Sequence, residues 1–348
     1  MTQQQSLPRI VTLSEIDTVV SKDSFALKLI DAITHGFVSY SNGGFNACPI
    51  QTMGAPPMAP FSGYDDSSSG GDYQAQTCVK SGYVTGASHY VIKVASGGNP
   101  FPNSGLMQLY SQRTGKLETI LLDEGILTEL RTAAVGAVAA QLLAPETLFK
   151  SNAEGCIGVL GTGIQARYQL QYLAHVLKCR NVKVWGRTKE NVQLYVKEMN
   201  MQGWNVSAAE TPQDLLATCS LIVTTTSSRE ALIPYVADNI NHPLHITCIG
   251  SDTTGKIELD PKLVANADLL VADCRVVASE RGEFEDALKQ KLVGLDRVVD
   301  LGELIEKKEL HRKSGDGDDG RLTIFDSSGI AVQDCVIAAM VNKALTEK

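Results

Sequence analysis

The pattern of hydrophobic residues divides the chain into two kinds of region. In the first region, apolar side chains recur four residues apart, at Phe25, Leu29, Ile33 and Phe37. This spacing predicts a helix over 24–40, which Gly43-Gly44 would end. Strand-like runs follow at 90–94, 106–111 and 117–122. The residues up to about 130 therefore predict an α+β region.

The pattern changes after a predicted helix at 132–143, which Pro145 ends. Short apolar runs rich in β-branched residues predict strands at 156–160, 182–185, 221–225, 245–249 and 269–271. Helical stretches at 165–176, 189–201 and 211–217 separate them, and a last helix is predicted at 330–345. Such alternation predicts an α/β fold with a parallel sheet and helices on both of its faces.

Composition narrows the function classes. The 348 residues contain 31 Lys+Arg and 39 Asp+Glu, a formal net charge of −8, so neither nucleic acid nor an anionic membrane is an expected partner. We see no membrane span and no targeting segment. The eight cysteines form no C-x-x-C pair, and no spacing suggests a metal site. We expect a cytoplasmic protein with reduced thiols and no metal.

A dinucleotide-binding motif follows the first strand of the second region. The motif Gly161-Thr162-Gly163-Ile164-Gln165-Ala166 has the form G-x-G-x-x-A, between a predicted strand and a predicted helix. Gly161 allows a tight turn, Gly163 lets a pyrophosphate approach, and Ala166 lets helix and strand pack closely. The free N–H groups of the helix start favour phosphate. Residues 161–165 are therefore predicted to bind a dinucleotide, against the alternative of a Rossmann fold that binds nothing there.

The turn after the next strand bears on the choice of dinucleotide. NAD enzymes commonly place Asp or Glu there to bind the ribose 2′-hydroxyl, but this chain has Gly186, Arg187 and Thr188. A guanidinium and a hydroxyl suit a 2′-phosphate. We favour NADP(H), with NAD(H) as the alternative if Arg187 points to solvent.

Further polar residues follow two later strands. Thr225, Thr226 and Ser227 end the strand at 221–225 and are predicted to line the cofactor crevice. Asp252 follows the strand at 245–249, at the carboxyl edge of the sheet. A carboxylate there can serve as a general acid/base, although loop and cap Asp residues are also common.

The chain resembles the ornithine cyclodeaminase/μ-crystallin family. The resemblance lies in Leu127-Thr-Glu-Leu-Arg131-Thr-Ala-Ala, in the glycine motif 160–166, in Gly250-Ser-Asp252-Thr-Thr-Gly-Lys-Ile-Glu-Leu-Asp-Pro, and in 325–334. It implies a Rossmann dinucleotide-binding domain at 132–325 and an α+β substrate-binding and dimerisation domain at 1–131 and 326–348. It also implies a homodimer.

The resemblance further implies roles for single residues. Asp252 matches the family's catalytic acid/base, while Lys93 and Arg131 match residues that bind the substrate's α-carboxylate. We take Lys93 as a catalytic candidate as well. Ser328 and Gly329, in the closing segment, are expected to bind substrate.

Two departures from the family pattern bear on the substrate. Gln51 stands where the family usually has an arginine, which weakens the usual carboxylate-binding set. Lys80 stands near a position that is acidic in enzymes acting on ornithine. If Lys80 points into the pocket, then Lys80, Lys93 and Arg131 match two carboxylates and disfavour a diamine. If it points to solvent, this argument fails.

We therefore predict an NAD(P)H-dependent oxidoreductase that reduces a small dicarboxylic imino acid to an L-amino acid. The best candidate reaction is iminosuccinate to aspartate, because 250–256 and 324–334 are most similar to the iminosuccinate reductase branch. One alternative is ornithine cyclodeaminase, which turns ornithine into proline and ammonia. Another is a non-catalytic NADPH-binding and small-ligand-binding protein of the μ-crystallin type.

Overall fold

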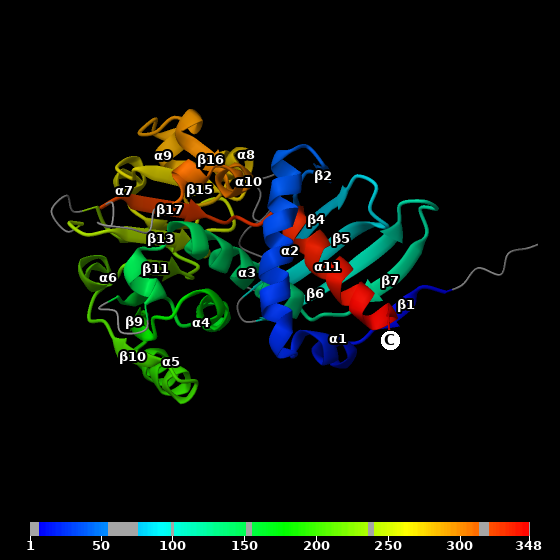
Figure 1. Cartoon of the computed structure of the whole chain (residues 1–348), viewed down its shortest axis with the longest axis horizontal. Coiled ribbons are helices and arrows are strands. Elements are labelled where there is room, and N and C mark those ends of the chain that lie inside the picture. Colours follow the sequence, from blue (N-terminus) through cyan, green and yellow to red (C-terminus); the bar gives the residue numbers. More distant parts are fainter. Residues whose placement is uncertain are drawn as a thin grey trace, which may run out of the picture. The chain divides into compact units, whose positions relative to one another are not determined.

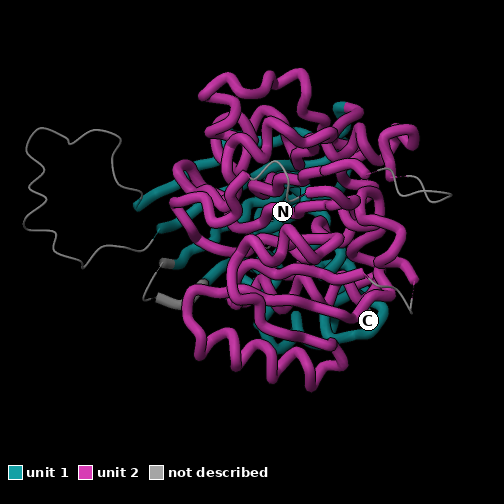
Figure 2. Tube along the Cα trace, turned by 90° about the vertical axis from the view of Figure 1, so that its left-hand side faces the viewer, with its two compact units in different colours: residues 1–25, 43–128, 331–348 teal, residues 26–42, 129–330 magenta. Residues whose placement is uncertain are grey.

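The computed structural model describes residues 7–54, 76–98, 101–150, 155–235, 240–312 and 320–347. Its contacts divide the chain into two compact units (Figures 1 and 2). Unit 1 comprises Met1–Phe25, Gly43–Thr128 and Ala331–Lys348, and unit 2 comprises Ala26–Asn42 and Glu129–Ile330. The predicted domain boundaries at 131/132 and 325/326 stay a prediction, because compactness does not say which part binds substrate.

Unit 2 is built on an eight-stranded sheet in which every pair of neighbours is parallel. In chain order the strands are β8 (Ile157–Leu160), β9 (Asn181–Trp185), β10 (Asn205–Ala208), β11 (Leu221–Thr224), β13 (Leu244–Cys248), β15 (Leu269–Ala272), β16 (Val298–Asp300) and β17 (Leu322–Asp326). Their order across the sheet is β10-β9-β8-β11-β13-β17-β15-β16. The chain builds outward from β8 to β10 and then returns to β11 on the other side of β8. The direction of winding therefore reverses between β8 and β11, where doubly wound sheets bind their ligands.

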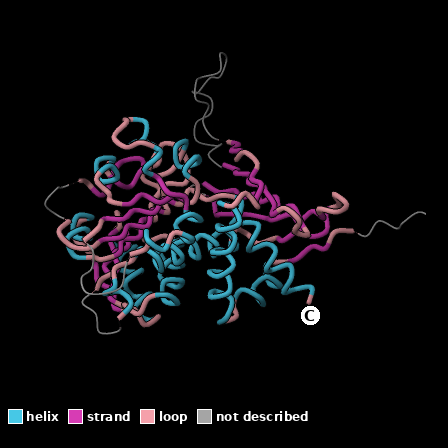
Figure 3. The backbone as a smooth tube through the Cα atoms, turned by 45° about the horizontal axis from the view of Figure 1, so that its top comes forward, coloured by secondary structure: helices cyan, strands magenta, loops and turns pink. Residues whose placement is uncertain are grey.

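Both faces of this sheet are buried, as the strand composition predicts. Along β11, Ile222 belongs to one apolar core and its neighbours Leu221 and Val223 belong to another. Because successive side chains of a strand point to opposite faces, the two cores lie on opposite faces of the sheet. Figure 3 shows helices along both sides of these strands. The helices described in unit 2 are α4 (Ile164–Val176), α5 (Lys189–Met201), α6 (Pro212–Thr218), α7 (Pro261–Ala265), α8 (Arg275–Glu280), α9 (Glu285–Lys289), α10 (Leu301–Glu306), most of α2 (Asp23–Ser41) and most of α3 (Ile126–Leu143).

Short elements complete unit 2. A two-stranded parallel sheet joins β12 (Arg229–Ile233) to β14 (Ile257–Leu259), both of which follow strands of the large sheet in the chain. Three turns of 3-10 helix lie at Glu146–Phe149, Leu295–Arg297 and Lys308–Leu310.

Unit 1 contains a mixed sheet with α11 (Ala331–Thr346) packed against β4 and β5. Its strands are β1 (Arg9–Val11), β2 (Phe45–Ala47), β3 (Gln51–Met53), β4 (Gln76–Val84), β5 (His89–Gly98), β6 (Phe101–Ser111) and β7 (Leu117–Leu121), and α1 (Leu13–Val20) follows β1. The order is β1-β7-β6-β5-β4-β2, with β3 also paired to β4. Among the described strands of this sheet, only β1 and β7 run parallel, and the other pairs are antiparallel. Figure 1 shows α11, in red, crossing these strands.

Helix α3 is long and apolar enough to resemble a membrane span by length and composition. However, 72% of these 18 residues are buried inside the structure, which is typical of a core helix. Its close packing has a visible cause. A Cβ on Gly136 would collide with the side-chain amide of Gln169 on α4, so a larger residue would displace that amide. The expected cytoplasmic location stays a prediction.

The predicted α/β fold is confirmed, and most predicted elements agree with the observed bounds within one residue, whereas β5 ends four residues later and β6 begins five residues earlier than predicted. Helix α3 is the main exception, because it begins at Ile126 rather than at 132. The carboxylate of Asp123 accepts the Leu127 N–H at 3.1 Å and so starts the helix six residues earlier. The short strands β10, β12, β14 and β16 and the central strand β17 were not predicted.

Candidate functional site

The glycine motif forms a tight link between β8 and α4. Gly161 has a φ of +111°, and a Cβ there would lie 2.6 Å from the Thr225 hydroxyl oxygen. Glycine is therefore required by conformation and by space. Gly163 precedes the first residue of α4, and a Cβ on it would meet no atom of the chain within 4 Å. The start of α4 thus faces open space, as a phosphate-binding helix terminus must.

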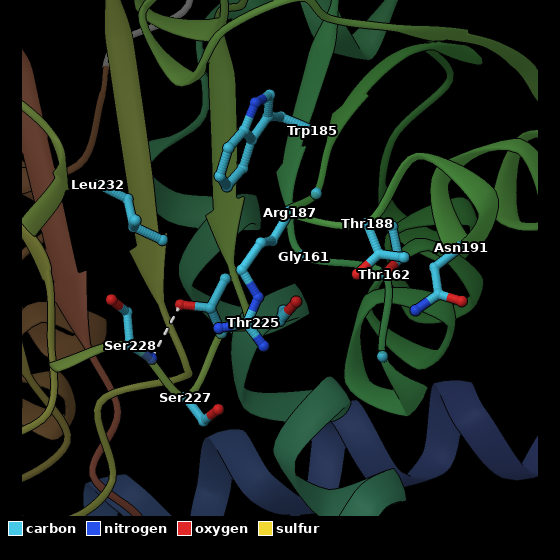
Figure 4. A pocket seen from close by; sticks show the side chains of 13 residues that line it. Gly161, Thr162, Trp185, Arg187, Thr188, Asn191, Thr225, Ser227, Ser228 and Leu232 are labelled. Atoms are coloured by element: carbon cyan, nitrogen blue, oxygen red, sulfur yellow. Dashed lines mark hydrogen bonds between the residues drawn. The ribbon is translucent and has the colours of Figure 1, made fainter. Parts of the chain in front are cut away.

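The adjoining strand completes a pocket at the point where the winding reverses. The backbone N–H and the hydroxyl of Thr225 both donate to the carbonyl of Leu160, at 2.8 and 3.1 Å. A cavity of about 320 Å³ opens here (Figure 4). Its lining residues are Gly161, Thr162, Gly163, Trp185, Gly186, Arg187, Thr188, Asn191, Thr225, Thr226, Ser227, Ser228 and Leu232.

Most of the predicted cofactor residues therefore meet in one cavity. Ile164 and Gln165 do not line it. Ile164 is 49% exposed, and the Gln165 amide donates to the backbone carbonyl and the carboxylate of Glu129 on α3. A second amide on α4, from Gln169, donates to the Thr132 carbonyl at 3.1 Å. These two glutamines tie the cofactor helix to the turns of α3 that flank Arg131.

The donors of the cavity fit a dinucleotide. Hydroxyl side chains and the start of α4 surround the glycine turn, and phosphate and ribose oxygens accept from hydroxyl groups and from the N–H groups of a helix start. Arg187 and Thr188 are exposed at the end of β9, and Figure 4 shows the Arg187 side chain extending into the cavity. Among the described residues that line it there is no carboxylate, so none of them would repel a 2′-phosphate.

Asp252 lies on the loop after β13, in the same unit. Its carboxylate is half exposed, and an oxygen lies 2.6 Å from the ammonium of Lys256. The Ser251 hydroxyl donates to the Lys256 carbonyl at 2.6 Å, which closes the loop. Asp252 is thus held on a short, internally bonded loop beside a cation. An ionised carboxylate in that position can accept a proton or return one.

Buried carboxylates beneath this edge of the sheet escaped the sequence analysis. They are Glu258, Glu283, Asp273 and Asp326, each at most 1% exposed. Burial raises the pKa of Glu258, of Glu283 and of Asp326. In sequence they belong to four separate segments, so no local spacing signals them. A Glu in the β14 strand, flanked by apolar residues, was the one available hint.

Asp273 explains the position of two predicted substrate residues. Its carboxylate accepts from the Ser328 hydroxyl at 3.3 Å and from the Gly329 N–H at 2.6 Å. Gly329 has a φ of +79°, a conformation that favours glycine. Ser328 and Gly329 are both buried. Any role in substrate binding stays a prediction.

In unit 1, two lysines share one face of the sheet. Lys80 on β4 pairs directly with Lys93 on β5, and directly paired residues of antiparallel strands point to the same face. Their exposures are 5% and 3%. The Lys93 ammonium lies 3.5 Å from a carboxylate oxygen of Asp334 on α11, which is also buried. Lys80 is therefore not a solvated strand residue.

Gln51 does not join this pair. It pairs with Val79 on β4, the neighbour of Lys80 in the chain, so its side chain lies on the opposite face of the sheet. Gln51 is exposed there. Arg131 lies in unit 2 and is 4% exposed. Among the residues described, no group of three or more His, Cys, Asp or Glu side chains forms a metal site.

Comparisons with known proteins agree with this architecture. A sequence model of the ornithine cyclodeaminase/mu-crystallin family matches residues 91–348. An uncharacterized cyclodeaminase of Sinorhizobium fredii is 32% identical over 286 residues, covering 80% of this chain and 82% of its own. The iminosuccinate reductase of Paracoccus denitrificans is 31% identical over 233 residues, covering 67% of this chain and 68% of its own.

Solved structures match over nearly the whole chain. The crystal structure of the Paracoccus denitrificans iminosuccinate reductase in complex with NAD+ has a TM-score of 0.79 at 25% identity, covering 98% of this chain and 96% of the other. An archaeal alanine dehydrogenase, described as a dimer with bound NAD, also has a TM-score of 0.79 at 25% identity, over 98% of this chain and 96% of its own.

Proposed function

This chain belongs to the ornithine cyclodeaminase/mu-crystallin family, and on that premise we propose that it is an NAD(P)H-dependent oxidoreductase reducing a C=N bond. The substrate we propose is a small dicarboxylic imino acid, and the product is an L-amino acid. Iminosuccinate, which would give aspartate, is the best candidate. The observation that carries this choice is the buried pair of Lys80 and Lys93.

The charge of that pair favours a dianion. Two ammonium groups within one buried face are costly unless anions lie near them. Asp334 supplies one carboxylate beside Lys93, and the charge of Lys93 also acts on the buried carboxyl group of Asp123. Arg131 adds a guanidinium, which binds carboxylates with two parallel hydrogen bonds. We assign Lys93 and Arg131 to the α-carboxylate and Lys80 to the second carboxylate.

Asp252 is the proposed acid/base. Its carboxyl group would donate a proton to the imine nitrogen, or its carboxylate would hold an already protonated nitrogen, because the carbon of a protonated imine accepts a hydride more readily. The ammonium of Lys256 lies 2.6 Å from one carboxylate oxygen of Asp252. A bound reduced nicotinamide dinucleotide supplies the hydride. The cations that bind the carboxylates orient the substrate, and this orientation lowers the entropic part of the activation barrier.

For the dinucleotide we propose a preference for NADPH. Support comes from Arg187 and Thr188 at the cavity and from the missing carboxylate. Both solved relatives described above are named with NAD, so NADH is the alternative. The choice depends on one exposed guanidinium, which makes it directly testable.

We also propose a homodimer formed through unit 1. The sheet face opposite the lysine pair carries Ile10, Met53 and Tyr90, which are 58%, 54% and 37% exposed. Exposed apolar side chains gathered on one sheet face are typical of an interface. The proposed occupant is a second copy of this chain, as in the archaeal relative described as a dimer.

One alternative function has a specific observation behind it. The Sinorhizobium fredii relative is named a cyclodeaminase, which would favour ornithine as substrate. The buried ammonium of Lys80 opposes this, because ornithine would bring a second ammonium into the pocket. A non-catalytic NADPH-binding protein remains the third candidate, and retention of Asp252 opposes it.

The test is an absorbance assay with oxaloacetate and ammonium, which form the imine in solution. NADPH and NADH are compared, and a run without ammonium measures simple keto-acid reduction. We expect ammonium-dependent oxidation of NADPH with oxaloacetate and at least about tenfold less with pyruvate, since one buried charged hydrogen bond is lost. Conversion of ornithine to proline with no reaction of oxaloacetate would overturn the proposal.

A further inference from the structure

Glu258 lies between two loops. One follows β11 and carries Thr226, and we call it the cofactor loop; the other follows β13 and carries Asp252. One carboxylate oxygen, Oε1, accepts from the backbone N–H and the hydroxyl of Thr226, at 2.6 and 2.7 Å. The other, Oε2, accepts from the Gly250 N–H at 3.0 Å and from the Thr224 hydroxyl at 2.6 Å. Each oxygen thus binds the backbone of a different loop.

The two loops also approach each other closely at this point. A Cβ on Gly250 would collide with the backbone carbonyl of Thr226 and would lie 2.7 Å from the Glu258 carboxyl carbon. Glycine is therefore required for the approach. The side chain of Glu258 is 0% exposed, so water cannot replace its hydrogen bonds.

Glu258 is itself fixed by a second carboxylate. Its backbone N–H and that of Leu259 donate to Glu283, at 3.0 and 2.6 Å. The N–H of Glu283 donates in turn to Asp326 at the end of β17, at 3.1 Å. The carboxylate of Glu258 therefore cannot follow one loop away from the other without breaking bonds to the centre of the sheet.

We infer that Glu258 is a positioning residue for the proposed reaction, one that holds the cofactor loop of Thr226 and the acid/base loop of Asp252 in fixed register. Only the catalytic part of this inference rests on the proposed function.

A carboxylate is required at this position for a geometric reason. Backbone N–H groups cannot rotate, so both oxygens must accept, and no other side chain of this length offers two acceptors.

Glu258→Gln tests this requirement. The amide keeps the size of the side chain but has one acceptor, so its NH2 group must face either the Thr226 N–H or the Gly250 N–H. We expect the dissociation constant of NADH, followed by its fluorescence, to rise about 10-fold or more, since charged buried hydrogen bonds are lost. We expect kcat with oxaloacetate and ammonium to fall at least about 10-fold at saturating NADH, with little change in the KM of oxaloacetate.

Binding of ADP separates positioning from general loss of structure. ADP carries the adenosine half of the dinucleotide and its pyrophosphate, which we expect to bind at the glycine turn and Arg187 rather than beside Thr226. Competition against NADH should show ADP affinity unchanged in Glu258→Gln. A matched control is Glu230→Gln on β12, the strand paired with β14, because the Glu230 side chain is exposed. This control should match the parent protein in both binding and turnover.

If Glu258→Gln does not fold, Thr224→Val removes one donor without changing size, and a smaller shift in the same direction is expected. Unchanged NADH binding and unchanged kcat in a folded variant would overturn the inference. Equal weakening of NADH and ADP would also overturn it, because that indicates a structural role alone. If the parent protein reduces no imine, the proposed function fails, yet the NADH and ADP measurements still test Glu258.

Discussion

Lys80 and Lys93 lie directly opposite each other on neighbouring antiparallel strands, and each is at least 95% buried. A carboxylate oxygen of Asp334 on α11 lies 3.5 Å from the Lys93 ammonium. Two buried ammonium groups rarely lie side by side in a protein unless anions lie near them, because burying a charge without a counter-charge is costly. The pair is the feature of unit 1 that most directly constrains the substrate.

Asp252→Asn should nearly abolish turnover. The amide cannot donate a proton to the imine nitrogen, and general acid/base groups contribute about 10²- to 10⁴-fold to rate. NADH binding, measured by fluorescence, should stay within about twofold because Asp252 does not line the cofactor cavity. A variant that loses cofactor binding to the same degree would show that Asp252 has a different role.

Arg187→Ala should separate the two dinucleotides. Loss of a guanidinium facing a 2′-phosphate should weaken NADPH binding about 10- to 100-fold, the usual range for a charged hydrogen bond, and leave NADH within about twofold. Fluorescence titration of both cofactors measures this. Lys189→Ala is a control in the same turn, because Lys189 does not line the cavity. Equal weakening of NADH and NADPH by Arg187→Ala would contradict the proposed preference.

Asp123 should make stability depend on pH. Burial raises the pKa of its carboxyl from 3.8 to about 6, although the charge of Lys93 and several backbone N–H groups lower it. The folded state therefore holds this proton more tightly than the unfolded state. The stabilising contribution is complete below about pH 4 and is lost as pH rises through about 6. The loss amounts to roughly 3 kcal/mol, at 1.36 kcal/mol per pKa unit.

Asp123→Asn tests this assignment. Asparagine stays neutral and still accepts the Leu127 N–H that begins α3. Urea unfolding at several pH values should show the variant gaining stability relative to the parent protein between pH 4.5 and 7.5. All other titrating groups cancel in that difference. A constant difference between the two proteins across this range would show that Asp123 does not titrate there.

Ile10→Lys should weaken the proposed homodimer. Ile10 is 58% exposed on β1, on the sheet face opposite the lysine pair, and a charge there is costly to bury between two subunits. Sedimentation of the parent protein should give a dimer, and the variant should shift toward the monomer at micromolar concentration. Leu194→Lys, on the outer side of α5 and 51% exposed, is the matched control and should remain dimeric. A monomeric parent protein would contradict the proposal outright.

The sequence predicts the parallel sheet and the cofactor turn well because both depend on local signals. The glycines of 161–163, the helix after them and the strand at 182–185 are all close in the chain. The side of the sheet to which Lys80 points could not be predicted. A strand alternates its faces with period two, so the answer depends on the pairing register with β5, which a sequence alone does not fix.

The buried carboxylates could not be predicted for a related reason. The apolar neighbours of Glu258 hint at burial, but its partners become apparent only when β14 brings it beside the ends of β11 and β13. Asp273 and Asp326 end strands that are neighbours in the sheet but 53 residues apart in the chain. Long-range pairing, rather than local propensity, creates this cluster.

The most direct test of the central claim compares Lys80→Met with the parent protein on two substrates. Methionine keeps the length and apolar body of lysine and removes its charge. With NADPH and ammonium, we predict that kcat/KM for oxaloacetate falls at least about 10-fold while that for pyruvate stays within about threefold, because only the second carboxylate has lost its partner. Equal loss on oxaloacetate and pyruvate, or no loss on either, would contradict the assignment of Lys80 and with it the dicarboxylic substrate.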